Sequence, residues 1–152
     1  MTKENRRLLL IEICARLPYG VKAQHNNKKE IFGAIEQIEA EGDIDLSYYD
    51  EDTEMWKLCC TSIDNIKPYL RPMSSMTEEE RVEYRKAFEK DFAILEDSID
   101  APIAYKYSDG MIVSDRVLFN EIDWLNKKMF DFRGLIPMGL ALEAKEDMYK
   151  TE

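Results

Sequence analysis

The chain has 152 residues, the length of one ordinary domain or of two very small ones. Its hydrophobic content of 45% and charged content of 34% are typical of a globular protein. The longest apolar run, residues 8–11, is far shorter than a membrane span requires, and Glu12 and Arg16 interrupt what a secretory signal would need. We therefore expect a cytoplasmic protein without a membrane segment.

The net charge of −10 is unevenly distributed along the chain. Residues 30–66 hold eleven acidic side chains and a single base, Lys57. An acidic chain repels phosphate at long range, which disfavours general nucleic-acid binding. Two exceptions stay open: the acidic block could mimic nucleic-acid phosphates, or the bases near the N-terminus could form a local patch. Those bases are Arg6, Arg7, Arg16, Lys22, Lys28 and Lys29.

Several common chemistries lack their residues in this sequence. The three cysteines include the adjacent pair Cys59 and Cys60 but no Cys-x-x-Cys, and His25 is the only histidine, which argues against zinc and against a catalytic triad. The glycines Gly134 and Gly139 are not followed by the Lys-Ser/Thr of a phosphate loop. The acidic residues 43–54 do not follow the order of a calcium loop. We expect no catalytic residue, no cofactor and no metal, and hence a protein that is not an enzyme.

The N-terminal segment has the pattern of an amphipathic helix. Apolar residues recur at three- and four-residue spacing over residues 3–17, with Glu12 and Arg16 among the polar residues between them. Pro18 and Gly20 then end the helix, because proline restricts the residue before it and glycine frees the backbone.

Residues 20–72 read as short strands separated by turns. Alternating patterns occur at 21–24, 44–48 and 55–61, with turn residues between them. For residues 30–40 we predict a strand, with a helix as the alternative because Ile31, Ile35 and Ile38 have helical spacing. A single helical turn near residues 62–65 followed by a short final strand is typical of small SH3-like barrels. The segment therefore predicts a small antiparallel SH3-like β-barrel or meander.

The C-terminal half is predicted to be mainly helical. Thr77 and Glu80 form a capping box, and an apolar stripe from Val82 carries this helix to about Ser98. Residues 103–113 form either a hairpin or an ordered loop, and a second helix follows with Ser114 as its cap. The apolar tail, with Leu135, Ile136, Met138, Leu140 and Leu142, is expected to pack on its own domain or on a second copy of the chain.

Aromatic side chains are the best candidates for an interaction site. Those expected on strands can form a cage or a peptide-binding groove on a small barrel, although core and sheet packing is the more frequent role of such residues. The candidate interaction residues are Tyr48, Tyr49, Trp56, Tyr69, Trp124 and Arg133.

Three stretches, residues 15–21, residues 66–80 and residues 123–126 with 130–144, carry a resemblance. Two characteristic sequences within them are Lys67-Pro68-Tyr69-Leu70-Arg71-Pro72 and Phe130-Asp131-Phe132-Arg133-Gly134. In these stretches the chain resembles small uncharacterised proteins encoded in gut Bacteroidales genomes, often in prophage-like or mobile regions. The resemblance implies an accessory protein in the bacterial cytoplasm, and it assigns no activity or site residue.

Together these patterns predict an α+β protein. Residues 1–72 would form a helix plus a small barrel, and residues 73–152 a helical part packed on it. The expected function is that of a non-enzymatic accessory protein of phage or mobile-element type, acting through contact with a protein partner of unknown identity. The alternative is a nucleic-acid-related role, by the N-terminal bases or by acidic mimicry.

Overall fold

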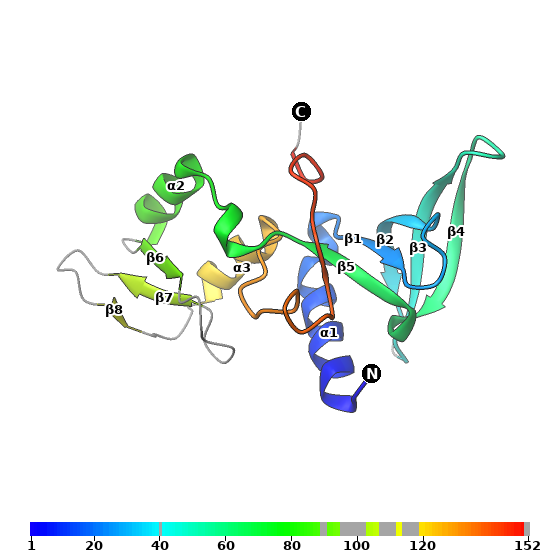
Figure 1. The fold of residues 1–152 in the computed structure, drawn as a ribbon, viewed down its shortest axis with the longest axis horizontal. Helices are drawn as coiled ribbons and strands as arrows, with labels where there is room; N and C mark the ends of the chain where they lie inside the picture. Colours follow the sequence, from blue (N-terminus) through cyan, green and yellow to red (C-terminus); the bar gives the residue numbers. More distant parts are fainter. Residues whose placement is uncertain (40, 89–90, 95–102, 107–111, 114–118, 151–152) are drawn as a thin grey trace. The chain divides into compact units, whose positions relative to one another are not determined.

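The computed structural model describes residues 1–39, 41–88, 91–94, 103–106, 112–113 and 119–150, which form helices and two sheets (Figure 1). The chain divides into two compact units, described separately below. The sheet unit comprises residues 1–70 and 135–152, and the helical unit comprises residues 71–134. The predicted α+β class, with an N-terminal helix and helices after the sheet, is confirmed.

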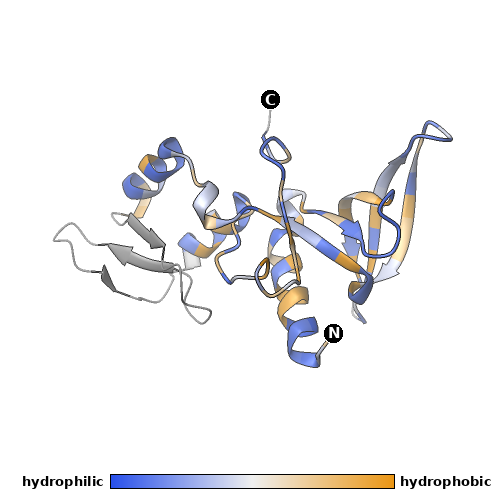
Figure 2. Ribbon diagram, viewed as in Figure 1, coloured by the Kyte–Doolittle hydropathy of each residue, from blue (hydrophilic) through white to orange (hydrophobic). Residues whose placement is uncertain are grey.

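The sheet unit contains one α-helix, two short 3-10 turns and six strands. In chain order these are α1 (Lys3–Arg16), η1 (Leu17–Tyr19), β1 (Lys22–His25), β2 (Phe32–Ile38), β3 (Asp43–Asp50), β4 (Met55–Ser62), η2 (Ile63–Asn65), β5 (Ile66–Leu70) and β9 (Leu142–Glu143). Figure 2 shows hydrophobic residues concentrated in the middle of α1 and along the sheet strands.

Helix α1 forms where it was predicted, but its buried face differs from the prediction. The side chain of Thr2 caps its start, and Gly20 with φ of 73° ends the turn that follows. Leu9 and Ile13 are buried, and so are Glu12 and Arg16, which had been assigned to the polar face. The two charged side chains lie four residues apart and form an ion pair.

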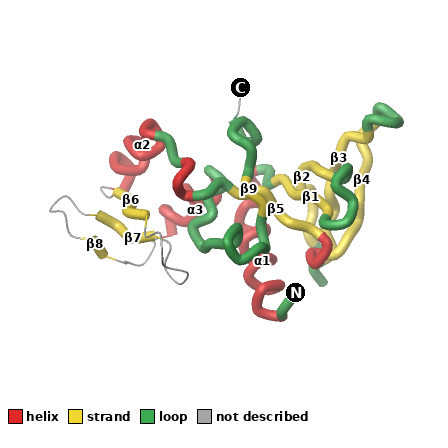
Figure 3. Tube along the Cα trace, in the orientation of Figure 1, coloured by secondary structure: helices red, strands yellow, loops and turns green. Residues whose placement is uncertain are grey.

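The six strands form one open sheet of order β4-β3-β2-β1-β5-β9 (Figure 3). Strands β1 to β4 are an antiparallel meander, as predicted, and η2 supplies the expected turn before β5. The prediction of a closed barrel is wrong, because the sheet is open. The outer edge of β5 pairs in parallel with β9, which comes from the C-terminal segment and makes the sheet mixed. The sheet therefore keeps two open edges, β4 and β9.

Residues 30–40, predicted as a strand with a helix as the alternative, contain strand β2. Ile35 pairs with Leu46 and Ile38 with Ile44, and the register shifts between Ile35 and Gln37. This bulge inserts one extra residue, so two isoleucines three positions apart face the same side of the sheet. The helical spacing seen in the sequence thus arises from a bulged strand.

Residues 135–150 of the C-terminal segment contact strands β1 and β5 of the sheet. Leu135 and Leu140 are buried, whereas Met138 is exposed, so only part of the predicted apolar tail is packed. The hydroxyl of Tyr149 donates to the Tyr69 carbonyl oxygen at 2.8 Å and accepts from the Lys22 backbone N–H at 3.0 Å. Burial raises the pKa of Tyr149 to about 12. This hydroxyl joins the C-terminal segment to two strands.

The described residues of the helical unit form one 3-10 turn, two α-helices and a three-stranded antiparallel sheet of order β6-β7-β8. In chain order these are η3 (Met73–Ser75), α2 (Glu78–Phe88), β6 (Asp91–Ile94), β7 (Ile103–Lys106), β8 (Ile112–Val113) and α3 (Phe119–Lys127). Its described core consists of Met73, Met76, Tyr84, Leu125, Phe130 and Phe132. The pairing of β7 with β8 confirms the hairpin, while the proposed cap Ser114 lies outside the described residues.

Helix α2 begins as predicted and ends earlier. Its buried residue is Tyr84, whereas Val82, assigned to the core stripe, is 38% exposed. The predicted continuation to Ser98 is wrong, because the helix ends at Phe88 and Asp91 begins strand β6. The backbone of β6 pairs with β7, a contact between distant residues that helical spacing cannot reveal.

The capping box gives a prediction for stability. The Glu80 N–H donates to Thr77 Oγ1 at 3.2 Å, and the Thr77 N–H donates to Glu80 Oε2 at 3.0 Å. Thr77→Ala removes the first bond and is expected to destabilise the protein by about 0.5–2 kcal/mol. Urea unfolding would measure the change, with the exposed Ser74→Ala as control. An unchanged midpoint for Thr77→Ala would show that the cap contributes nothing.

Candidate functional site

Two large aromatic side chains lie exposed on the β3–β4 hairpin. Tyr49 and Trp56 are directly opposite each other in the register, and their rings meet edge to face with centroids 5.7 Å apart. Trp56 is 72% exposed and Tyr49 is 47% exposed. Because such large apolar surfaces are normally buried, this pair is a candidate contact point for a partner.

The strand register places further residues on the same face. Leu58, which is 61% exposed, lies opposite Ser47, and Ser47 lies opposite Ala34 on β2. Alternate residues of a strand share a face, so Trp56 and Leu58 project to the same side as Tyr49 and Ser47. The opposite face carries the buried Ile44 and Leu46. The exposed apolar residues therefore belong to the side of the sheet that faces away from the core.

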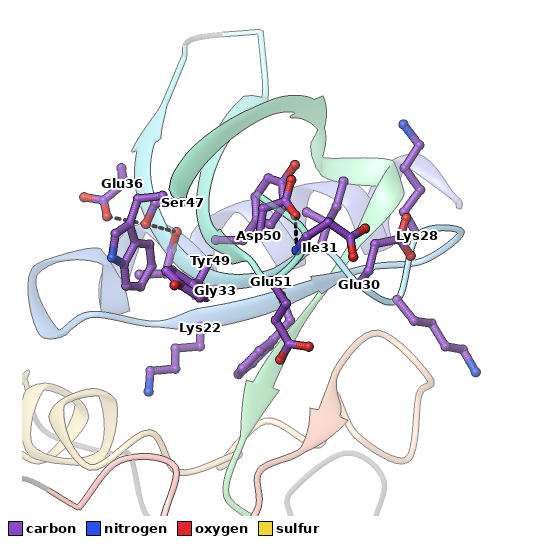
Figure 4. A pocket seen from close by; sticks show the side chains of 16 residues that line it. Lys22, Lys28, Glu30, Ile31, Gly33, Glu36, Ser47, Tyr49, Asp50 and Glu51 are labelled. Carbon is purple, nitrogen blue, oxygen red and sulfur yellow. Dashed lines mark hydrogen bonds between the residues drawn. The ribbon is translucent and has the colours of Figure 1, made fainter. Parts of the chain in front are cut away.

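A groove of about 1340 Å³ covers part of this face and the β1–β2 turn (Figure 4). It has Glu36 and Ser47 at one end and Lys28 and Glu30 at the other, as Figure 4 shows. The complete lining is Lys22, Lys28, Lys29, Glu30, Ile31, Phe32, Gly33, Ala34, Glu36, Ser47, Tyr48, Tyr49, Asp50, Glu51, Asp52 and Trp56.

Close strand packing shapes the floor of the groove. At Gly33 a β-carbon would lie only 1.7 Å from the backbone oxygen of Ser47, so no other residue fits there without moving β3. The Ser47 hydroxyl donates to Glu36 Oε1 at 2.6 Å, which holds this carboxylate at the groove. The floor is thus formed by backbone and small side chains, with room above it.

Acidic groups border the groove at the β3–β4 turn. The Asp50 carboxylate forms an ion pair with Lys57, which lowers the pKa of Asp50 and raises the pKa of Lys57. Asp50 Oδ1 also accepts the backbone N–H of Asp52 at 3.0 Å, which orders the turn. Among the described residues, no ion pair engages Glu51 or Asp52. This end of the groove therefore favours a cationic ligand group.

Phe32 and Tyr69 form a second aromatic pair in the sheet unit. Their rings meet edge to face at 5.4 Å, and the Tyr69 hydroxyl donates to Gln24 Oε1 at 3.3 Å. Burial raises the pKa of Tyr69. Phe32 lines the groove and is 39% exposed, whereas Tyr69 supports it from the neighbouring side.

Two of the predicted interaction residues lie in the helical unit. Trp124 is half-buried in its core, with its ring 5.4 Å from Tyr84 and its Nε1 donating to Glu83 Oε1 at 2.9 Å. The guanidinium of Arg133 lies 5.4 Å from the ring centre of Phe132. The geometry gives both side chains packing partners within their own unit.

The structure thus brings Tyr48, Tyr49 and Trp56 together at one groove and adds residues that sequence reasoning missed. The main omissions were Phe32, which lines the groove, and Leu58, which is exposed on the same face but does not line the groove. Leu58 stands two positions after Trp56, so the strand alternation that was recognised for residues 55–61 would have placed both on one face. No such signal distinguishes Phe32.

The groove lining contains few of the residue types used in nucleophilic catalysis. It includes no histidine and no cysteine, and its one serine, Ser47, donates its hydroxyl proton to Glu36. The Cys60 thiol is hydrogen-bonded to the Asp45 carboxylate. This raises the pKa of Cys60 and makes its thiol less reactive. Within the described ranges, no three acidic, histidine or cysteine side chains are grouped to hold a metal ion.

None of the helices in the described part of the chain is long and apolar enough to cross a membrane.

Comparisons with known proteins give no match. A scan against protein-family models finds no match, and no curated protein and no solved structure is similar to this chain.

Proposed function

We propose that this protein is a non-enzymatic binding protein whose sheet unit holds an extended segment of a partner protein in the aromatic groove. The observation that carries the proposal is the Trp56–Tyr49 pair, exposed on the open face of the sheet beside the groove. Tryptophan and tyrosine are enriched among the residues that dominate binding energy in protein interfaces.

The energetics of exposure support a binding role. An exposed Trp56 gains little in the free protein, whereas its burial beneath a partner removes a large apolar area from water. The ring of Tyr49 already holds the indole on one side, which reduces the entropy that binding must overcome. The pair is therefore a preorganised anchor.

The charges at the groove indicate the chemistry of the partner. Glu51 and Asp52 line the groove at the β3–β4 turn, and Glu36 lies beside Ser47 at one end. An extended segment with apolar side chains and at least one Lys or Arg would complement both features. The partner segment is accordingly basic and apolar.

A protein partner fits better than a nucleic acid because of the positions of the N-terminal bases. Arg16 is fully buried against Glu12, and Arg6 pairs with Asp64 at 3.2 Å. The Lys22 ammonium donates to the Met148 carbonyl at 3.0 Å. These three side chains have partners within the sheet unit, which argues against a basic patch that would contact phosphates.

We infer an SH3-like fold whose ring is left open, an inference supported by the strand order and by the turn η2 before β5. The biological setting comes from the sequence resemblance: an accessory protein of phage or mobile-element type, acting in the bacterial cytoplasm. In that setting a small acidic protein would act by occupying a basic segment of a host or phage protein.

Selection of peptides tests the binding function directly. Random dodecapeptides displayed on phage would be selected on the wild-type protein, and the affinities of enriched peptides measured by calorimetry. Trp56→Ala is expected to weaken binding at least about tenfold, as for a central interface residue. Met55→Ala is the matched control, because Met55 is 58% exposed on the same strand but does not line the groove.

The outcomes separate the proposal from its rivals. Failure to enrich any peptide, or equal binding by Trp56→Ala and wild type, would remove the aromatic groove as the site. Enriched peptides that are basic but not apolar, and that are insensitive to Trp56→Ala, would instead favour acidic mimicry of nucleic acid.

A further inference from the structure

Strand β4 is an open edge of the sheet. It ends the strand order and pairs with β3 alone among the described strands. The pairing runs over all eight residues of β4, from Met55 to Ser62, without a register shift. The outer side of this strand is therefore long and regular.

The hydrogen-bond pattern identifies which backbone groups point outward. The Ile63 N–H donates to the Gly42 carbonyl at 2.9 Å, and this pair continues the β3–β4 register. In an antiparallel ladder hydrogen-bonded pairs alternate with non-bonded pairs, so the residues opposite Tyr49, Ser47 and Asp45 are non-bonded. These residues are Trp56, Leu58 and Cys60, whose N–H and C=O groups point away from β3.

The same three residues also present their side chains. Trp56 and Leu58 are among the most exposed apolar residues described, and Cys60 is exposed beside them. A strand added at this edge would pair with their backbone and cover their side chains at once. Backbone and side-chain recognition thus coincide along one strip, which we call the β4 edge.

Natural sheets usually protect such an edge with charges, proline, bulges or short strands. The β4 edge has no proline and no bulge, and its one charged residue, Lys57, is paired with Asp50. The opposite edge differs, because β9 has two residues and is soon followed by the charged residues 145–147. The contrast indicates that the β4 edge is kept open for a partner.

The charges of the hairpin decide what that partner is. Asp43 and Asp45 lie on the neighbouring strand β3, the turn at residues 50–54 contains four acidic residues, and Lys57 is the only base between residues 30 and 66. A second copy would bring the same acids against these acids, which disfavours self-pairing. A segment rich in Lys or Arg is attracted instead.

We propose that the β4 edge accepts a basic, extended segment of a partner protein as an additional strand. The segment pairs with the outward backbone groups of Trp56, Leu58 and Cys60 and lays alternate apolar side chains against Trp56 and Leu58. This inference rests on the binding function proposed above: Trp56 belongs both to the groove and to the β4 edge, and strand addition places the partner segment along that edge.

Leu58→Pro and Leu58→Ala form a matched pair for the test. Both remove the leucine side chain, but only proline removes the N–H that points away from β3, so the β3–β4 hydrogen bonds stay intact. Affinity for the peptides selected on the wild-type protein is the measurement, and melting curves check folding. Leu58→Pro is expected to bind about tenfold more weakly than Leu58→Ala, the loss that one or two backbone hydrogen bonds would produce.

A second measurement covers the case in which Leu58→Pro unfolds. Each selected peptide would be made in two versions, one with N-methyl groups on the backbone amides of its odd positions and one on those of its even positions, and each version would be titrated into the wild-type protein. Strand addition predicts that one version loses binding and the other keeps it, because only alternate amides of an edge strand face its neighbour. Equal binding by both versions would overturn the proposal.

The outcomes also separate this inference from the binding function. If Trp56→Ala loses binding while Leu58→Pro and Leu58→Ala bind equally, the groove stands and strand addition is wrong. If Trp56→Ala binds as wild type, the binding function itself fails. Selected peptides that are acidic would overturn the proposal that the partner segment is basic. Concentration-dependent dimers of the chain that Leu58→Pro abolishes would overturn it as well, because the edge would then pair with a second copy.

Discussion

Arg16→Met is expected to destabilise the protein by about 3–5 kcal/mol, the cost of breaking a buried ion pair from one side. Arg16 is 0% exposed, and its Nη1 donates to Glu12 Oε2 at 2.6 Å and to the Glu12 carbonyl at 3.0 Å. Glu12 is 2% exposed. Removing the guanidinium leaves the Glu12 carboxylate buried without its cation, which carries a large desolvation cost.

The measurement is urea unfolding of three variants. Arg7→Met is the matched control, because Arg7 is exposed on the same helix and its loss should change stability by less than about 0.5 kcal/mol. The double variant Glu12→Leu/Arg16→Met removes both charges and should recover most of the loss. A double variant as unstable as the single one would show that packing, rather than charge, holds this site.

This pair also shows where reading the sequence fails. The periodicity of residues 3–17 was sufficient to predict the helix, but it placed Glu12 and Arg16 on the polar face because charged residues are usually solvated. Their spacing of four residues allows each to neutralise the other, so both enter the core together. Ile11, whose spacing predicts a place on the buried apolar face, is instead 44% exposed.

Non-local pairing explains the other differences. The bulge in β2 and the parallel contact of β9 with β5 depend on residues far apart in the chain, which local patterns do not encode. The same holds for β6, whose apolar residues continue the helical spacing of α2 but whose backbone pairs with β7. Elements with strong local signals, such as the Thr77 cap and η2, were predicted correctly.

The candidate site was predictable to the extent that strand alternation is predictable. Tyr49 and Trp56 lie on one face because the turn between them sets the register of β3 and β4. Trp124 was selected for its residue type alone, and it lies on a helix where aromatic residues usually fill a core, as it does here. The open edge of β4 required the topology, since a closed barrel would have had no edge.

Deletion of residues 135–152 is expected to convert the protein into an aggregating or strongly dye-binding species. The deletion removes the buried Leu135 and Leu140 and strand β9, and it exposes the edge of β5. Each buried leucine contributes roughly 1.5–3 kcal/mol, so the loss of both, about 3–6 kcal/mol, is comparable to the lower end of the stability of a typical small domain. Gel filtration and fluorescence of a hydrophobic dye would measure the effect. Met138→Ala is the control, because Met138 is 42% exposed in the same segment.

A milder change at one hydroxyl keeps this prediction testable if the deleted chain does not fold. Tyr149→Phe removes the bonds to the Tyr69 carbonyl and the Lys22 N–H and should cost about 1–3 kcal/mol. The folded protein holds the Tyr149 proton up to a pKa of about 12, above the ordinary value of 10.0. The stability from this group is complete below pH 10.0 and is lost as the pH rises towards 12, because the unfolded chain ionises first. Tyr149→Phe should therefore lose stability less steeply than wild type over that range. A deleted chain that stays monomeric with an unchanged melting temperature, together with identical pH profiles, would show that the segment does not stabilise the sheet.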